Sequence, residues 1–333
     1  MKKFKETIWK DGEYNYEAAY GFVPNIHGYI HDEDDVNRDC ILVVPGGGYC
    51  LCAPHEGEMI AEVFYNKGLN AFVLTYTTDI TMSVPLKKQP LEDISRGVRF
   101  IRKHGAEYNI EEKRLIVCGF SAGAHVVGSL AVHFADINDK SEEYAKISNR
   151  PDGAILSYPV ITSGEYTHKY SMQTLLGSEP SEEELTYFSL EKQVSENTPP
   201  CFIWQTATDN AVPVENSYLM AEALRAKGIM FSHHVFPTGF HGISYPSDKF
   251  FSANAGGEYV MEQVERAVAA VKSGKGVNVS DQRRKELEEQ FPDKKPDDQE
   301  NTSSDENLPP MDMTWSQDIG LWPDLAYAWM NRI

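Results

Sequence analysis

The sequence has few cysteines, a deficit of basic residues and no long apolar run. Its 333 residues include five cysteines, a small and odd number that argues against a disulfide framework and fits the reducing cytoplasm. Lys and Arg number 31 against 50 Asp and Glu, a formal net charge of −19, so the clustered basic surface that nucleic acids or anionic membranes require is not expected. No stretch of about eighteen apolar residues occurs, and charged residues interrupt the region after the basic N-terminus. The sequence therefore predicts neither a membrane-spanning helix nor a signal peptide.

The sequence also lacks a clustered set of metal ligands. Cys50 and Cys52 are two residues apart, too close for an easy mutual disulfide, and no second Cys/His cluster lies near them in the sequence. We therefore predict no metal site.

What is present is a globular composition in which two kinds of segment alternate. Hydrophobic residues make up 41% and charged residues 24%. Short continuous apolar runs, typical of strands that are covered on both faces, are separated by longer segments of helical period. The predicted strands are Ile41–Val44, Ala71–Thr75, Arg114–Cys118, Ala154–Tyr158, Phe202–Gln205 and Phe231–Phe236. This alternation predicts an α/β fold with a mostly parallel central sheet and helices on both faces.

Three parts of the chain are distinguished by composition. Residues 1–275 are expected to form one α/β domain, within which 162–200 is a long, Ser-, Glu- and Tyr-rich insertion resembling a cap. Residues 276–312 are highly charged, and we interpret them as an insertion or linker with a short helix at its start. Residues 313–333 regain aromatic residues and are expected to dock a final helix on the core.

The strongest chemical signal is the pentapeptide Gly-Phe-Ser-Ala-Gly at 119–123, between a predicted strand and a helical run. Gly-x-Ser-x-Gly in this context is the nucleophile elbow, in which a strained turn presents the serine hydroxyl at the edge of the sheet. Gly119 and Gly123 are needed because a Cβ at either position would clash across the turn. A chance turn is the alternative, and the placement between strand and helix favours Ser121 as a nucleophile.

A glycine run at 46–48 follows another predicted strand. It matches neither the spacing of a dinucleotide fingerprint nor the Lys-Ser/Thr of a phosphate-binding P-loop. Consecutive glycines let backbone N–H groups approach a ligand, as an oxyanion hole requires. We predict that Gly47, Gly48 and Ala122 donate to the oxyanion formed at the serine.

A serine nucleophile needs a base and an orienting carboxylate, which follow it in hydrolase chain order. Asp209 and His241 each lie just beyond a predicted strand, so both can converge on Ser121 at one edge of the sheet. The alternatives are a capping aspartate and a surface-loop histidine. His125, four residues after the serine, is expected to pack beneath the glycine loop as a structural residue.

With these motifs the sequence resembles a known group of enzymes. Pro-Gly-Gly-Gly-Tyr at 45–49, Gly-Phe-Ser-Ala-Gly-Ala-His at 119–125, Thr-Asp-Asn-Ala-Val-Pro at 208–213 and Gly-Phe-His-Gly at 239–242 are similar to motifs of α/β-hydrolase esterases. The resemblance is to the hormone-sensitive-lipase-like and xylan acetyl-esterase/feruloyl-esterase groups and spans about residues 43–244. Pro45 stands where the more general loop has histidine, as is common in the sugar-esterase branch. The resemblance implies hydrolysis of acetyl or other short acyl esters, often on plant-derived sugars.

We therefore predict a serine carboxylesterase that hydrolyses short-chain, acetyl-type esters on carbohydrates such as acetylated xylo-oligosaccharides and needs no cofactor. Tyr49, His168 and Phe240 are the candidate substrate-binding residues. An aromatic wall for a sugar is open to Tyr49, Tyr76, Tyr170, Phe240 and Trp315, although core packing is the more frequent role of each. A homo-oligomer is left open, as is the role of residues 245–312.

Two rival functions remain at this point. A prolyl-oligopeptidase-like peptidase shares the order of the triad, but such enzymes usually carry a large N-terminal gate. Only about forty residues precede the first predicted strand here. A non-catalytic binding protein on the same fold would generally have lost the serine, the histidine or the glycine loop.

Overall fold

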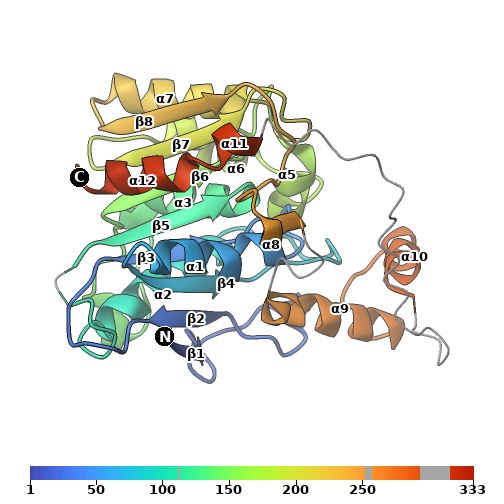
Figure 1. The fold of residues 1–333 in the computed structure, drawn as a ribbon. Coiled ribbons are helices and arrows are strands. Elements are labelled where there is room, and N and C mark those ends of the chain that lie inside the picture. The colour runs from blue at the N-terminus through green and yellow to red at the C-terminus, as the bar shows by residue number, and fades with distance from the viewer. Residues whose placement is uncertain (112, 252–256, 293–315) are drawn as a thin grey trace.

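The central sheet has the strand order β1-β2-β4-β3-β5-β6-β7-β8 (Figure 1). It is seen in a computed structural model that describes residues 1–111, 113–251, 257–292 and 316–333. The strands are β1 (Lys2–Thr7), β2 (Asn25–Ile30), β3 (Cys40–Val44), β4 (Asn70–Thr75), β5 (Leu115–Phe120), β6 (Gly153–Ser157), β7 (Cys201–Thr206) and β8 (Phe231–Phe236). β1–β2 and β2–β4 pair antiparallel, and every other neighbouring pair is parallel. The predicted mostly parallel α/β sheet is confirmed.

Helices connect the strands and cover both faces of the sheet. The α-helices are α1 (Glu58–Tyr65), α2 (Gln89–Lys103), α3 (Ala122–His133), α4 (Glu142–Ala145), α5 (Lys169–Leu176), α6 (Glu182–Tyr187), α7 (Glu215–Ala226), α8 (Asp248–Phe251), α9 (Glu262–Lys272), α10 (Asp281–Gln290), α11 (Ser316–Ile319) and α12 (Trp322–Met330). The 3-10 helices are η1 (Glu17–Ala19), η2 (Pro54–Glu56), η3 (Phe134–Asp136), η4 (Leu190–Lys192) and η5 (Glu258–Met261).

The apolar runs of the parallel strands alternate between two cores. Ile41 and Val43 of β3 pack in the core that α1 and α12 close, whereas Leu42 packs on the opposite face with α2, α3 and α7. Successive side chains of a strand point to opposite faces, so in a strand that is covered on both faces nearly every side chain enters an apolar core. This is why five of the six predicted strands appear in the sequence as continuous apolar runs.

The first two strands were missed, and the expectation that about forty residues precede the sheet is wrong. β1 is an exposed edge strand in which Phe4 is the single apolar residue among lysines, a glutamate and a threonine. In β2, Gly28 leaves room for the Phe4 ring, whose nearest atom would lie 2.2 Å from a Cβ at that glycine. A charged edge strand such as β1 gives no apolar run, and in β2 the residues Asn25, His27 and Gly28 interrupt one.

The final helix docks as expected. The Trp322 ring of α12 stacks on Trp204 of β7 with ring centres 5.3 Å apart, and its Nε1 donates to the Ser244 carbonyl oxygen at 2.7 Å. The C-terminal segment is thereby attached both to the sheet and to the loop that follows β8. Trp315, however, lies outside the described residues, as does all of 293–315.

The charged segment contains the short helix that was predicted, and that helix is packed. Leu287 of α10 is buried with residues of α9 and with Cys50 and Ile80. Arg283 of α10 donates from Nε and Nη2 to the Ile80 carbonyl oxygen at 2.9 and 2.6 Å. The described part of 276–312 therefore lies against the loops that follow β3 and β4.

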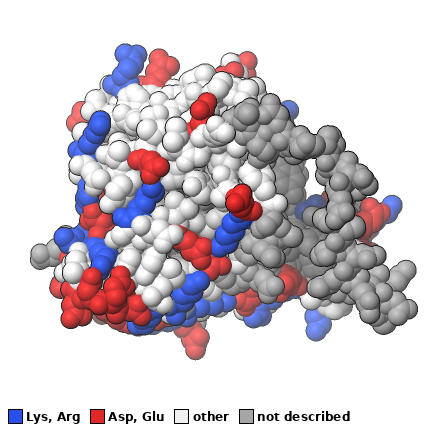
Figure 2. Space-filling model, viewed as in Figure 1, with Lys and Arg blue, Asp and Glu red and all other residues white. Residues whose placement is uncertain are grey.

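Basic side chains on the face shown in Figure 2 stand between acidic ones. Lys3 pairs with Glu58 at 2.9 Å and Lys249 with Glu62 at 2.6 Å. All five cysteines are buried free thiols. Over the described ranges, no helix is long and apolar enough to cross a membrane, and no three His, Cys, Asp or Glu side chains are grouped as metal ligands.

Candidate active site

Ser121 lies in the sharp turn between β5 and α3. Its φ is +52°, a backbone region that residues other than glycine adopt only under strain. A Cβ at Gly119 would lie 2.3 Å from the Gly123 carbonyl oxygen, and one at Gly123 would lie 2.2 Å from the carbonyl oxygen of Val44. Only glycine fits at these two positions, so the predicted placement of the motif is confirmed.

His241 and Asp209 reach Ser121 from the loops that follow β8 and β7. The Ser121 hydroxyl donates to Nε2 of His241 at 2.7 Å, and Nδ1 of His241 donates to Oδ2 of Asp209 at 2.8 Å. The Asp209 side chain is 1% exposed, and its Oδ1 accepts the backbone N–H groups of Ala211 and Val212, both at 2.9 Å. With Asp209 fixed, Nδ1 of His241 carries the proton and Nε2 faces the serine as an acceptor. The structure thus brings together the three residues predicted to be catalytic.

Two threonines hold the histidine loop against the aspartate loop. The hydroxyls of Thr206 and Thr208 both donate to the carbonyl oxygen of Gly239 at 3.0 Å. The backbone N–H of His241 donates to Oδ1 of Asn210 at 3.3 Å. These contacts set the distance between the base and its carboxylate before any substrate arrives.

The glycine loop lies directly over the nucleophile turn. A Cβ at Gly46 would lie 2.9 Å from the Cβ of Ser121. Within the described residues, the backbone N–H groups of Gly47, Gly48 and Ala122 donate to no protein acceptor. They are therefore available to an oxyanion, and that role stays a prediction.

A buried carboxylate that sequence analysis missed joins this loop to the histidine loop. Glu56 is 2% exposed, and its Oε2 accepts the backbone N–H of Gly46 at 2.7 Å while its Oε1 accepts the Tyr158 hydroxyl at 2.6 Å. The Tyr158 oxygen accepts the backbone N–H of Ser244 at 3.1 Å, and its ring packs edge-on against His241 with centres 5.0 Å apart. Burial, reinforced by Glu56, raises the pKa of Tyr158 well above its usual value, so the hydroxyl stays protonated and donates.

No motif marks Glu56, because in sequence it resembles any glutamate near a helix start. Its importance comes from its contacts: a buried carboxylate that accepts two short hydrogen bonds is costly to leave half satisfied. We infer that it positions the glycine loop relative to His241.

Replacing Glu56 with glutamine is therefore expected to lower kcat for ester hydrolysis by about tenfold or more, with a smaller change in KM. The amide has only one acceptor oxygen, so either Gly46 or Tyr158 loses its partner and the oxyanion donors shift. Steady-state kinetics on a p-nitrophenyl ester measure the effect. Glu58→Gln, which removes an equal charge from the surface ion pair with Lys3, is the matched control. A folded Glu56→Gln enzyme with unchanged kcat would contradict the positioning role.

His168 and Phe240 lie beside the triad. The His168 ring centre is 6.5 Å from that of His241, and Nδ1 of His168 shares a 2.7 Å hydrogen bond with the Ser171 hydroxyl. Burial, and then the nearby His241, lower the pKa of His168. Phe240 precedes the catalytic histidine and is 38% exposed. Both positions are compatible with substrate contact.

Tyr49 does not lie on the accessible side of the site, so its assignment to substrate binding is wrong. Its side chain is 1% exposed, and its hydroxyl donates to Nδ1 of His125 at 2.7 Å. Nε2 of His125 then donates to the Phe188 carbonyl oxygen at 2.9 Å, and burial lowers the pKa of this histidine to about 4, so the ring is neutral. The positive φ of Tyr49 (+64°) turns the side chain under the loop. The structural role predicted for His125 is confirmed.

Tyr170 of α5 takes the surface position that was expected of Tyr49. A Cβ at Gly48 would lie 2.9 Å from the Tyr170 ring, and the ring is 43% exposed. Residues 162–200 therefore contribute both Tyr170 and His168 to the rim of the site. Whether they move as a cap stays a prediction.

Two curated proteins are similar to this chain in sequence. The chain is 67% identical over 271 residues to endo-1,4-beta-xylanase B of Butyrivibrio fibrisolvens, covering 81% of this chain and 42% of that protein. It is 30% identical over 214 residues to an acetylxylan esterase of Xylanibacter ruminicola, covering 62% of this chain and 41% of that protein. The chain thus spans less than half of the length of each of these curated relatives.

A solved structure is similar to this chain over nearly the whole length of the solved protein. The acetyl ester-xyloside bifunctional hydrolase of Caldicellulosiruptor lactoaceticus superposes with a TM-score of 0.69 at 33% identity, covering 82% of this chain and 97% of that one. A family comparison matches residues 28–224 to BD-FAE, which is more than half of the chain. The chain therefore belongs to the BD-FAE family, within the esterases of the α/β-hydrolase fold.

Proposed function

We propose that this chain is a serine carboxylesterase that removes short acyl groups, acetyl above all, from carbohydrate. The observation that carries the proposal is the hydrogen-bonded chain from Ser121 through His241 to Asp209, with both contacts below 3 Å. An assembled triad with donors free to bind an oxyanion is the arrangement that acyl transfer requires. It also argues against a non-catalytic binding protein.

In the proposed mechanism, Ser121 Oγ attacks the ester carbonyl as its proton passes to Nε2 of His241. Asp209 stabilises the resulting imidazolium, and the N–H groups of Gly47, Gly48 and Ala122 bind the oxyanion. His241 then protonates the departing sugar hydroxyl, which leaves an acyl-serine. Water, deprotonated by the same histidine, releases the carboxylic acid and restores Ser121.

The carbohydrate part of the proposal is supported by two relatives, the acetylxylan esterase and the acetyl ester-xyloside hydrolase. The third relative, endo-1,4-beta-xylanase B, is matched over only 42% of its length, and we propose no glycosidase activity for this chain. Glycoside hydrolysis commonly uses two carboxyl groups that flank the scissile bond. Near Ser121, the carboxylate of Asp209 holds His241 and that of Glu56 is buried beneath the loop.

Hydrolysis of p-nitrophenyl acetate, butyrate and octanoate by the full chain tests the proposal. We expect kcat/KM to fall steeply with acyl length, because we propose that His168, whose ring centre is 6.5 Å from that of His241, and Tyr170, whose ring lies against Gly48, bound a small acyl pocket. Acetylated xylo-oligosaccharides should then release acetate. Absence of activity on every ester would reject the proposal, and equal activity on acetate and octanoate would reject its short-acyl part.

A further inference from the structure

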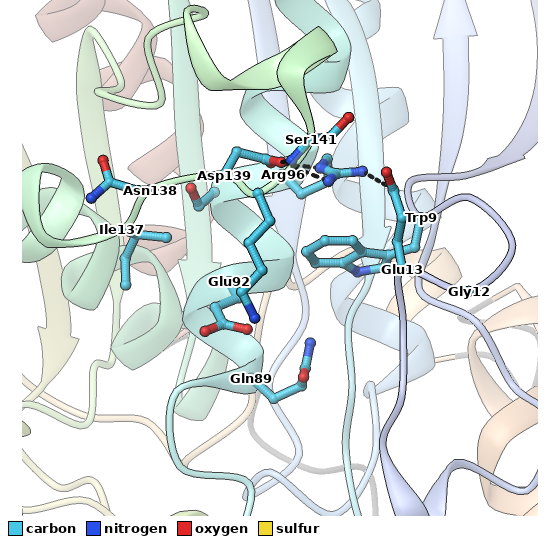
Figure 3. A pocket seen from close by; sticks show the side chains of 12 residues that line it. Trp9, Gly12, Glu13, Gln89, Glu92, Arg96, Ile137, Asn138, Asp139 and Ser141 are labelled. Carbon is cyan, nitrogen blue, oxygen red and sulfur yellow. Dashed lines mark hydrogen bonds and ion pairs between the residues drawn. The ribbon is translucent and has the colours of Figure 1, made fainter.

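A cavity unrelated to the triad opens beside α2. Its volume is about 390 Å³, and its lining includes Trp9 and Glu13 of the N-terminal loop, Gln89 and Glu92 of α2, and Asn138 and Lys140 beyond α3 (Figure 3). It shares no residue with the site around Ser121. A cavity of this size accommodates one or two sugar units, not a macromolecular partner.

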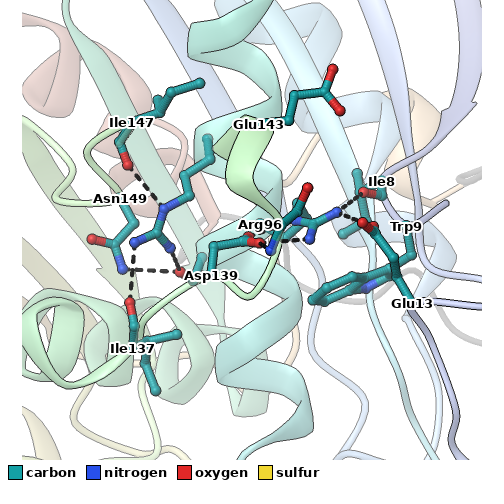
Figure 4. Close-up of polar contacts among 12 residues, drawn as sticks. Ile8, Trp9, Glu13, Arg96, Ile137, Asp139, Glu143, Ile147 and Asn149 are labelled. Carbon is teal, nitrogen blue, oxygen red and sulfur yellow. Dashed lines mark hydrogen bonds and ion pairs between the residues drawn. The ribbon is translucent and has the colours of Figure 1, made fainter. Parts of the chain in front are cut away.

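The floor of the cavity is a rigid, charge-balanced structure built on Arg96. The Arg96 guanidinium lies between the rings of Trp9 and Tyr144, 4.2 and 4.3 Å from their centres. It binds Asp139 through Nε and Nη2 at 2.6 and 2.7 Å and Glu13 through Nη1 at 2.6 Å (Figure 4). Because its side chain is 1% exposed and both carboxylates are paired with it, this cluster offers no free charge to a ligand.

One face of the Trp9 indole is therefore covered, and the ring is held in place. Nε1 of Trp9 donates to Oδ1 of Asp93 at 2.8 Å, so its polar edge is already satisfied. In Figure 3, Gln89 and Glu92 lie on the opposite side of the indole from Arg96. A fixed aromatic face bordered by polar side chains is a surface onto which the C–H face of a sugar ring can stack.

The polar groups that remain unpaired in the cavity are suited to hydroxyl groups. Within the described residues, the Glu92 carboxylate accepts no hydrogen bond, and burial raises its pKa. Asn138 adds an amide, with both a donor and an acceptor, and Lys140 adds a donor near Glu92. A carboxylate, an amide and an ammonium group at one cavity can together bind vicinal hydroxyls, which act both as donors and as acceptors.

We propose that this cavity is a second saccharide-binding site, which holds a xylose-type unit of the polymer whose ester is cleaved elsewhere on the molecule. The choice of sugar rests on the proposed function. Because the carboxylates of the Arg96 cluster are paired with its guanidinium, the charges left to face a ligand are those of Glu92 and Lys140, one of each sign, and such a pair favours neither an anionic nor a cationic ligand. The lining combines hydrogen-bonding groups with the face of Trp9, which suits a neutral polyhydroxylated ring with one C–H face.

Calorimetric titration with xylohexaose of the full chain carrying Ser121→Ala tests the site. The probe is unacetylated, so the measured heat comes from binding and not from ester cleavage. Adding Glu92→Ala is expected to weaken binding at one site about tenfold, the value of one hydrogen bond to a charged group. Glu142→Ala, at an exposed position of α4 outside the cavity, is the matched control and should leave binding unchanged. Trp9→Ala should abolish binding at this site. Glu92→Ala tests the proposal independently of any folding defect in the Trp9 variant.

Hydrolysis of p-nitrophenyl acetate by the single variant Glu92→Ala should equal that of the wild type. This separates the two proposals: an inactive wild-type enzyme rejects the esterase, whereas unaltered xylohexaose binding in Glu92→Ala rejects the second site. Absence of xylohexaose binding also rejects it. Binding of inorganic phosphate or trilysine in place of xylohexaose, lost in Glu92→Ala, would overturn the ligand class.

Discussion

The Ser121→Ala protein is expected to hydrolyse esters at least about 10⁴-fold more slowly than the wild type, with its fold unchanged. The hydroxyl is the only group of the triad that can form the acyl-enzyme, and its loss leaves only the oxyanion donors and binding. The side chain is 5% exposed, and its hydroxyl makes one side-chain hydrogen bond, to His241. Its removal therefore costs little packing.

The rate on p-nitrophenyl acetate and labelling by a fluorophosphonate probe measure this effect. Ser129→Ala is the matched control, since Ser129 lies on α3, the helix that follows Ser121, is 1% exposed and has a hydroxyl without a partner among the described residues. Labelling should disappear in Ser121→Ala and persist in Ser129→Ala. A Ser121→Ala protein that retains more than about a tenth of the wild-type rate would show that another nucleophile acts.

Asp209→Asn should lower kcat by about 10⁴-fold, although it changes a single atom of the side chain. Oδ1 of Asp209 accepts the N–H groups of Ala211 and Val212, so the oxygen of an asparagine amide must occupy that position. Its NH₂ group then faces Nδ1 of His241 and can only donate to it. The histidine is forced into the tautomer with the proton on Nε2, where it cannot accept the proton of Ser121.

The kcat of Asp209→Asn and its thermal unfolding temperature should be measured together. Glu215→Gln, a similar charge removal in the first turn of α7, is the control. We expect the unfolding temperatures of the two variants to be close, because the asparagine keeps both backbone hydrogen bonds. A loss of kcat below about tenfold in a folded Asp209→Asn protein would show that Asp209 does not set the tautomer.

Much of the fold and the three triad residues could be predicted from the sequence alone. The parallel strands are covered on both faces, so β3 and β5 appear as uninterrupted apolar runs whatever packs on them. The turn around Ser121 needs glycine on both sides for a local steric reason, and a local requirement leaves a local motif. Asp209 and His241 were found because parallel strands place their carboxyl ends at one edge.

The tertiary structure decided the rest, because those features depend on residues that are distant in the sequence. β1 forms only by pairing with β2, and its charged outer face hides it. Glu56 gains its importance from Gly46 and from Tyr158, 102 residues away.

The positive φ at Tyr49 sends that side chain inward, so that Tyr170 from a distant helix covers the loop in its place. The sequence determines the parallel strands because helices cover both of their faces, and it determines the nucleophile turn through local steric requirements. The buried contacts of Glu56 and the residues at the rim of the site are determined by packing between distant segments. Such contacts cannot be predicted from single positions in the sequence.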